Sequence, residues 1–299
     1  MSDICLIFGG NSQDGYYLGE LCRQSGMKVI SVSRTSENTF ENSKFIGDVS
    51  EFQLVADLIN KHKPHYIFHL AANSTTRHNA ILENYQTICL GTCNILESVK
   101  LFSPATRVFI TGSGLQFKNK GQAISEHDPF VYDTAYSMVR NSSVECARYY
   151  RSLGIAVYIG YLFHHESPLR KPSHVSKLIA MAAQRIALGS DEKLNIGDVS
   201  VRKEWGFAGD IARGILTLIS QDHVFEAVIG TGEGYTIEEW LNACFSIVNL
   251  DWHAYVNQDM NFNPEYSSLI SDPRTIFNLG WFPLTSFHSL AVMMMHHNH

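Results

Sequence analysis

Short apolar runs alternate with longer segments of helical spacing, and this alternation constrains the fold more than any other feature. The runs have the composition of buried strands and occupy residues 4–8, 28–33, 45–47, 66–70, 107–111 and 155–161. Segments of helical spacing follow them, at residues 14–25, 51–61, 80–100 and 135–150. Strands that alternate with helices of this length form βαβ units, whose strands are parallel. The sequence therefore predicts an α/β fold with a doubly wound parallel sheet.

The pattern changes after His164. A polar loop occupies residues 166–172, an amphipathic helix is expected at residues 175–188, and shorter elements mixed with loops follow. We expect residues 1–163 to form the sheet domain and residues 164–299 to form a smaller substrate-binding region, with some segments returning to the main domain. Substrate is then expected in the cleft between the two.

Charge and cysteine content exclude several classes of protein. The formal net charge is −6, which argues against general binding of nucleic acid or of an anionic membrane. No apolar run approaches the roughly 20 residues that span a bilayer. The six cysteines lie in apolar segments without a Cys-x-x-Cys pair, so we expect reduced thiols, a cytoplasmic protein and no metal site.

A glycine-rich loop joins the first expected strand to the first expected helix. Its spacing is Gly-x-x-Ser-x-x-Gly, and the candidate cofactor-binding residues are Gly9, Ser12, Gln13, Asp14 and Gly15. In a Rossmann-like sheet, backbone N–H groups and the positive end of a helix meet the pyrophosphate of a dinucleotide at this place. Ser12 is a small substitute for the usual glycine. The loop predicts a dinucleotide site.

Residues at the ends of later strands extend this site. Arg34 ends the second strand, where a carboxylate would grip the ribose hydroxyls of NAD and a cation suits the 2′-phosphate of NADP. Asp48 follows the third strand, and small residues end the fourth, at Leu70, Ala71 and Ala72. NADP is therefore the expected cofactor, with NAD possible.

Tyr136 and Arg140 stand four residues apart on an expected helix, so both side chains point the same way. A tyrosine phenol in water ionises near pH 10, so it needs a neighbouring positive charge to act as a base near neutrality. Arg supplies that charge, but its planar guanidinium stays protonated, whereas a Lys can also pass a proton onward. We expect both residues to be catalytic, to contact the cofactor, and to give slowed or altered redox chemistry.

With these motifs in order, the chain resembles the extended short-chain dehydrogenase/reductase superfamily and, more narrowly, GDP-mannose 4,6-dehydratase and its relatives. The narrower resemblance rests on the Gln-Asp-Gly opening at residues 13–15, on His-Glu-Ser-Pro at residues 165–168 and on Trp-Gly-Phe-Ala-Gly-Asp at residues 205–210. It covers nearly the whole chain. It implies an NAD(P)-dependent enzyme that acts on a nucleoside diphosphate-sugar, with GDP as the expected nucleotide.

The resemblance also implies a substrate site in the second region. The candidate residues that it places around the sugar nucleotide are Ser113, Glu166, Val175, Lys177, Arg185 and Arg202. Arg and Lys suit a diphosphate because their cationic groups donate to its oxygens. A further family Arg, expected just before Pro264, is Asn263 here. Family relatives pair through two long helices, which here are expected to hold residues 80–100 and 135–150, so a homodimer or homotetramer is implied.

The catalytic positions depart from the family pattern. Ser113 occupies the position of a family Thr and keeps a hydroxyl for the sugar oxygen, but Leu115 occupies the position of the Glu that removes the C5 proton. A leucine cannot accept a proton. Glu126 lies nearby in the sequence as an alternative carboxylate.

Three functions remain open. The first is a sugar-nucleotide 4,6-dehydratase with an altered catalytic site. The second is a 4-keto-sugar-nucleotide reductase, dehydrogenase or epimerase, which needs no elimination and so no Glu. The third is a catalytically silent protein that binds a sugar nucleotide or NADP as the partner of an active relative, since a fold does not determine a function.

Overall fold

A seven-stranded parallel sheet forms the larger part of the molecule. The computed structural model describes residues 2–35, 44–73, 75–259 and 261–296. The strand order is β11-β6-β5-β4-β1-β2-β3. The strands are β1 (Ile4–Phe8), β2 (Lys28–Ser33), β3 (Lys44–Ile46), β4 (Tyr66–His69), β5 (Arg107–Ser113), β6 (Val157–Leu162) and β11 (Glu226–Ile229). The expected α/β fold with a Rossmann-like parallel sheet is confirmed.

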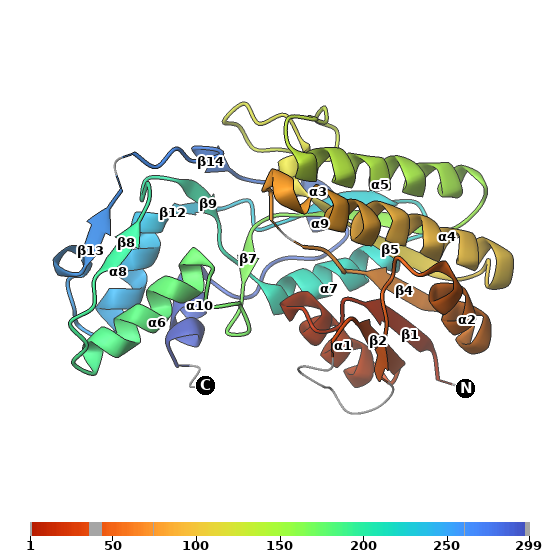
Figure 1. Ribbon diagram of the computed structural model, residues 1–299, viewed down its shortest axis with the longest axis horizontal. Coiled ribbons are helices and arrows are strands. Elements are labelled where there is room, and N and C mark those ends of the chain that lie inside the picture. Colours follow the sequence, from red (N-terminus) through yellow and green to blue (C-terminus); the bar gives the residue numbers. More distant parts are fainter. Residues whose placement is uncertain (1, 36–43, 74, 260, 297–299) are drawn as a thin grey trace.

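Helices cover both faces of this sheet (Figure 1). Leu6 and Phe8 of β1 pack in one core with α2 (Phe52–His62), α4 (Gly91–Phe102) and α5 (Ala135–Ser152). Cys5 and Ile7 point the opposite way, into a second core with α1 (Gln13–Gln24), α7 (Ala208–Ile219) and α9 (Arg274–Asn278). Side chains alternate between the faces of a strand, so a strand buried on both faces is apolar throughout.

The helical stretch expected at residues 80–100 is a series of four pieces. A 3₁₀ turn (His78–Ala80) and α3 (Ile81–Asn84) lead into a π-helical turn (Tyr85–Leu90), which continues as α4. A π-helical turn shifts the direction of the side chains that follow it and is frequent at functional sites. Here it places Thr87 on the wall of the large cavity described below.

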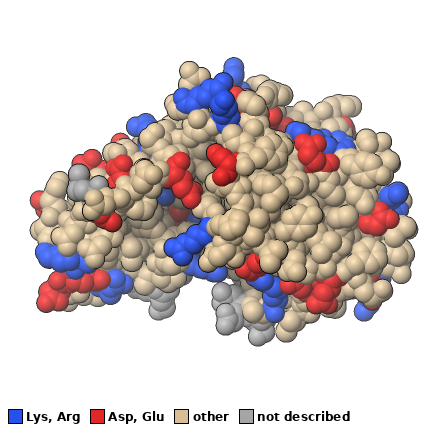
Figure 2. Space-filling model, turned by 45° about the horizontal axis from the view of Figure 1, so that its top comes forward, with Lys and Arg blue, Asp and Glu red and all other residues tan. Residues whose placement is uncertain are grey.

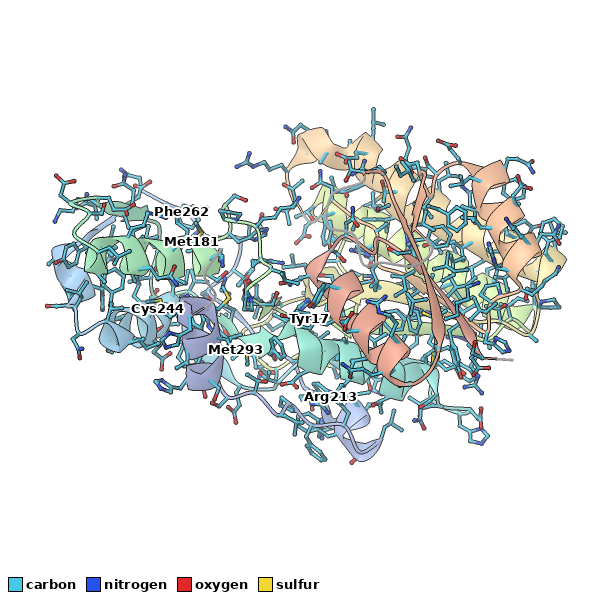
Figure 3. The ribbon with its side chains drawn as sticks, turned by 90° about the horizontal axis from the view of Figure 1, so that it is seen from below. Tyr17, Met181, Arg213, Cys244, Phe262 and Met293 are labelled. Carbon is cyan, nitrogen blue, oxygen red and sulfur yellow. The ribbon has the colours of Figure 1, made fainter. Side chains whose placement is uncertain are left out.

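The second region has its own apolar core. Its elements are α6 (Val175–Ala187), α8 (Ile237–Ile247), α10 (Phe287–His296) and the short strands β8 (Leu194–Ile196), β9 (Arg202–Glu204), β12 (Gly234–Thr236), β13 (Val256–Gln258) and β14 (Ser268–Leu269). Figure 3 shows Met181, Cys244 and Met293 within this group of helices. At its centre the rings of Trp205 and Trp240 stack with centroids 4.5 Å apart.

The chain after residue 164 is shared between the second region and the sheet. α7 packs on the sheet beside α1, and β11 pairs with β6 at the sheet edge. Two short strands, β7 (His165–Glu166) and β10 (Gly206–Phe207), pair with each other where the regions meet. Tyr17 of α1 makes an edge contact with Phe207 there, at a centroid distance of 4.9 Å (Figure 3). Among the described helices, none is long and apolar enough to cross a bilayer.

Candidate active site

A large cavity opens at the carboxyl ends of the parallel strands, between the sheet and the second region. Its volume is about 1320 Å³. The strand order reverses between β1 and β4, and such a switch point is where doubly wound sheets bind ligands. Figure 2 shows the surface hollowed between the two parts of the molecule, with charged side chains at the border.

The glycine loop lets the backbone pass close to its neighbours. Gly9 has a φ of +93°, and a Cβ added to it would lie 2.6 Å from the backbone nitrogen of Ala71. A Cβ on Gly15 would lie 2.5 Å from the carbonyl oxygen of Gly9. Any side chain at these positions would force the loop away from β4 and α1. The loop thus keeps the N-terminus of α1 facing the cavity, which suits a pyrophosphate.

Ser12 caps α1 instead of pointing into the cavity with its hydroxyl. Its Oγ accepts a hydrogen bond from the backbone nitrogen of Gly15 at 3.0 Å and donates to the carbonyl of Gly9 at 2.8 Å. A serine at this position stabilises the first turn of a helix. The substitution of Ser for the usual glycine is therefore compatible with the shape of the loop, and the first backbone N–H groups of α1 still face the cavity.

The side chains of Gln13 and Asp14 join α1 to the second region. Gln13 accepts a hydrogen bond from the Ser167 hydroxyl at 2.9 Å and donates to the carbonyl of His165 at 3.3 Å. Asp14 contacts the His165 ring at 2.9 Å. Burial on its own would raise the pKa of Asp14 and lower that of His165, but their mutual charge attraction and hydrogen bond reverse both shifts. Gln13 and Asp14 both line the cavity, but their side chains form the contacts of this junction.

Arg34 and Asp48 lie at the end of the cavity formed by β2 and β3. Arg34 is half-exposed and pairs with Glu83 at 3.0 Å. Asp48 accepts a hydrogen bond from the backbone nitrogen of Ser50 at 2.9 Å, which stabilises the turn after β3. A cation and a carboxylate thus stand together where the adenosine end of a dinucleotide would lie.

Leu70, Ala71 and Ala72 line the cavity directly after β4. Beneath them His69 is buried, and burial together with the charge of Arg140 lowers the pKa of His69 to about 4. A neutral imidazole is therefore the stable form at physiological pH. The neutral ring lets the cationic Arg140 occupy the same interior without a second charge.

Tyr136 and Arg140 lie on the first turns of α5, and both side chains are buried at the cavity wall. The Arg140 Nε donates to the Tyr136 hydroxyl at 3.0 Å, and its NH1 group donates to the carbonyl oxygen of Thr111 at 2.6 Å. The guanidinium lies 5.2 Å from the centre of the Tyr136 ring. The fork of Arg140 therefore holds the phenol at the end of β5 and supplies it with positive charge.

Ser113 and Leu115 line the same cavity, next to this pair. Ser113 accepts a hydrogen bond from the backbone nitrogen of Leu115 at 3.3 Å, and Leu115 packs beside Tyr136 in an apolar cluster. Gln116 is buried behind them and bonds Asn141, so it faces away from the cavity.

Glu126 does not take the place of the missing carboxylate. Its side chain accepts hydrogen bonds from the backbone nitrogen of Val228 at 3.2 Å and from the hydroxyl of Thr275. Both partners belong to the sheet edge and α9, and Glu126 is absent from the described lining of the cavity. This carboxylate is structural.

The second region lines the cavity with basic side chains that the sequence patterns did not single out. They are Arg170, Lys171 and His174, on the polar loop before α6. The sequence does contain a signal for these residues, because they come shortly after the His-Glu-Ser-Pro segment that carries the family resemblance. Burial and the charge of Arg170 lower the pKa of His174 to about 4.

Glu166 is fully buried behind this loop, in a cluster of charges. Its carboxylate lies 3.1 Å from Arg170 and 3.1 Å from the ring of His164. Nδ1 of His164 faces the carbonyl oxygen of Glu204 at 3.1 Å and therefore carries the proton, so its Nε2 accepts from the ammonium of Lys203 at 3.1 Å. Glu166 is the counter-charge of the partly buried Arg170 and the buried Lys203, and it supports the cavity wall from behind.

The remaining residues of the expected diphosphate site do not line the described cavity. Val175 packs against the core of the second region. Lys177 is buried and donates to the carbonyl of Pro168 at 3.0 Å. Arg185 is paired with Glu192 at 2.8 Å, and Arg202 is exposed on β9. The structure brings together the cofactor and catalytic candidates but not these four.

The fold and this cavity define a member of the NAD(P)-dependent epimerase/dehydratase class of short-chain dehydrogenases/reductases. The sequence profile of the GDP-mannose 4,6 dehydratase family matches residues 6–294, so the chain belongs to this family. GDP-mannose 4,6 dehydratase 1 of Arabidopsis thaliana is 28% identical over 320 residues, which cover 98% of this chain and 88% of that protein. The human GDP-mannose 4,6 dehydratase is 26% identical over 266 residues, covering 81% of this chain and 72% of the human protein.

Solved structures agree with this fold. The dTDP-glucose 4,6-dehydratase of Bacillus anthracis, in complex with NAD, superposes with a TM-score of 0.86 at 17% identity and covers 98% of this chain and 96% of that one. The UDP-glucose 4-epimerase of Thermotoga maritima, with UDP-glucose, has a TM-score of 0.85 at 18% identity, covering 98% and 97% of the two chains. At these identities the likeness concerns the fold.

Proposed function

We propose that this protein is an NAD(P)-dependent enzyme that modifies a GDP-linked sugar, similar to GDP-mannose 4,6-dehydratase but with a rebuilt catalytic site. The observation that carries the proposal is the Tyr136–Arg140 pair, buried at the wall of a cavity large enough for a dinucleotide and a sugar nucleotide. In this arrangement the phenol oxygen accepts from Arg140 and its own proton is directed to the substrate. Ser113 offers a second hydroxyl to the same sugar oxygen.

The residues fit a nicotinamide dinucleotide. The close approach of Gly9 to Ala71 and the open N-terminus of α1 suit its pyrophosphate, and Arg34 suits a 2′-phosphate. We therefore propose NADP rather than NAD. The bound cofactor would supply the reversible oxidation of a sugar carbon, while Tyr136 and Ser113 hold and exchange the proton of the sugar hydroxyl.

Leu115 favours a second candidate function, in which no water is eliminated. A 4-keto reductase, dehydrogenase or epimerase uses Tyr136 and Ser113 without a carboxylate at position 115. A third candidate, a catalytically silent binding partner, is favoured by Arg140, because one arm of its guanidinium is taken up by the Thr111 carbonyl at 2.6 Å.

We also propose a homodimer or homotetramer in the cytoplasm. Large apolar side chains are exposed on the helices after β4 and on α5, among them Leu82, Tyr85, Leu90, Tyr149 and Leu153. Figure 2 shows few charges over α4 and α5, and an apolar face of this kind suits a second copy of the chain. The described cysteines are all free thiols, as expected for a reducing compartment.

Product mass separates the candidate functions. Purified protein is incubated with NADP or NADPH and with GDP-hexoses or their 4-keto derivatives. Loss of one water supports the dehydratase, a change of two hydrogens supports the reductase or dehydrogenase, and an unchanged mass with an inverted stereocentre supports the epimerase. Tight binding with no change of the sugar supports the silent partner and contradicts an enzyme.

A further inference from the structure

Glu265 and Leu115 line the same two cavities, and Leu115 stands where the family pattern has a carboxylate. Glu265 lies in the segment before β14 and lines the large cavity together with Tyr136 and Leu115. It also lines an adjoining cavity of about 350 Å³, whose wall includes Gly114 and Leu115. Glu265 is thus the carboxylate common to both described cavities, and Leu115 lies on the wall of both.

The other carboxylates of the large cavity, within the described residues, are engaged elsewhere. Asp14 pairs with a histidine at the junction of the regions, Glu83 pairs with an arginine at the adenosine end, and Asp48 closes a turn there. These three surround the expected cofactor and not the expected sugar. Glu265 lies instead at the part of the cavity that Leu115 and Tyr266 line.

The contacts of Glu265 suit a group that exchanges protons. One carboxylate oxygen accepts a hydrogen bond from the neutral hydroxyl of Thr76. Tyr266, the next residue, is partly buried, and burial together with the charge of Glu265 raises its pKa to about 12. Glu265 itself is exposed, and Leu115, Leu269 and Tyr266 line the cavity with it, so its carboxylate is accessible to a ligand there.

We propose that Glu265 is the general base that removes the proton from the carbon next to the keto group of a 4-keto sugar nucleotide. The inference rests on the proposed function and adds a catalytic residue to it. In this step the C5–H bond breaks, the proton binds to the Glu265 carboxylate, and the electron pair forms an enolate whose oxygen accepts a hydrogen bond from Tyr136. Return of a proton from Glu265 to C5 completes an exchange and needs no oxidant or reductant.

The step is shared by elimination and by epimerisation at C5, because both begin with loss of this proton. A leucine at position 115 is then no obstacle to either reaction, since the base has moved from the end of β5 to the segment before β14. The carboxylate of Asp133 lines the smaller cavity but not the large one, so it provides a matched comparison.

Hydrogen exchange tests the proposal without turnover of the cofactor. GDP-4-keto-6-deoxymannose is incubated in deuterated water with the protein and oxidised NADP, which cannot reduce the ketone, and deuterium at C5 is followed by NMR. The wild-type protein should exchange C5 faster than buffer alone. Glu265→Gln should lower this rate about 100-fold, as expected for a lost general base. The affinity of Glu265→Gln for GDP should stay within about threefold of wild type, and so should the C5 exchange rate of Asp133→Asn.

A relocated carboxylate provides the rescue. Leu115→Glu combined with Glu265→Gln should restore C5 exchange, because a carboxylate at position 115 lines the same cavity. Wild-type exchange at the buffer rate, or an unchanged rate in Glu265→Gln, overturns the proposal. The proposed function is judged separately by NADP-dependent conversion and its loss in Tyr136→Phe, so the two can fail independently.

Discussion

The Nε atom of Arg140 lies 3.0 Å from the hydroxyl of Tyr136, and its NH1 group lies 2.6 Å from the carbonyl of Thr111. One guanidinium therefore joins the first turns of α5 to the end of β5 and orients the phenol. In this chain the cation next to the tyrosine is a guanidinium, which donates hydrogen bonds to two partners at once. The arrangement retains the positive charge that a catalytic tyrosine needs but leaves little of it free for a cofactor ribose.

Replacement of Tyr136 by Phe should abolish turnover under every enzymatic function considered. The change removes the hydroxyl and little else, so the rate should fall by about 100-fold to 10,000-fold, while NADP affinity measured by calorimetry changes little. Tyr149→Phe, on the exposed side of the same helix, is the matched control and should behave as wild type. Turnover that survives Tyr136→Phe would show that the active site has been misassigned.

Replacement of Arg140 by Met should reduce both stability and turnover. The buried Thr111 carbonyl and the phenol lose their donor, and an unsatisfied buried polar group costs about 1–3 kcal/mol of unfolding free energy. Urea denaturation measures this loss. Arg140→Lys restores a cation and should recover most of the turnover; a Met variant as active and stable as wild type would contradict the role assigned to the guanidinium.

Replacement of Arg34 by Asp should weaken NADP more than NAD. Loss of the cation removes attraction for the 2′-phosphate, which we expect to cost about tenfold in affinity, or about 1.4 kcal/mol. Glu83→Gln removes the carboxylate paired with Arg34 at 3.0 Å and should strengthen NADP binding. Equal effects of Arg34→Asp on the two cofactors, measured by fluorescence titration, would refute the preference for NADP.

Replacement of Glu166 by Gln should be strongly destabilising. It removes the counter-charge of the partly buried Arg170 and of the buried Lys203, and an unpaired buried charge costs about 3–5 kcal/mol. Burial already lowers the pKa of Lys203 to about 8 despite the favourable charge of Glu166. Glu238→Gln, on the surface of α8, is the control, with an expected change below about 0.5 kcal/mol. A similarly small change in Glu166→Gln would exclude the counter-charge role.

The contact of Asp14 with His165 should stabilise the junction of the two regions in a limited pH range. The pKa of His165 is raised above 6.5, so its contribution is complete below 6.5 and is lost as the pH rises through the folded-state value. The pKa of Asp14 is lowered below 3.8, so its contribution is complete above 3.8 and is lost as the pH falls through the folded-state value.

A double-mutant cycle with Asp14→Asn and His165→Gln measures this coupling by thermal unfolding. The coupling energy should be largest between the two ordinary pKa values and should decline on either side. We expect it to be clearly greater at about pH 5.5 than at about pH 9, because the histidine loses its charge as the pH rises through its folded-state pKa. A coupling energy that is the same at both pH values would contradict an ion pair.

Local patterns were sufficient for most of the sheet and for the part of the site formed by strand ends. The apolar run at β1 and the glycines behind it predict a buried strand and a tight loop, because both depend on neighbouring residues. The spacing of Tyr136 and Arg140 likewise places them on one helix face. The π-helical turn at Tyr85–Leu90 was not predicted, since it has the same apolar spacing as an ordinary helix.

The sequence alone determined the strand–helix alternation, the glycine loop and the departure of Leu115 from the family pattern, because each depends on residues close together in the chain. Only the tertiary structure decided which distant side chains meet. Asp14 reaches His165 across 151 positions, and Glu265 returns to the cavity wall beside Leu115 after the chain has passed through the second region. Such contacts depend on how the two regions pack and on the direction of each side chain, which no local periodicity contains.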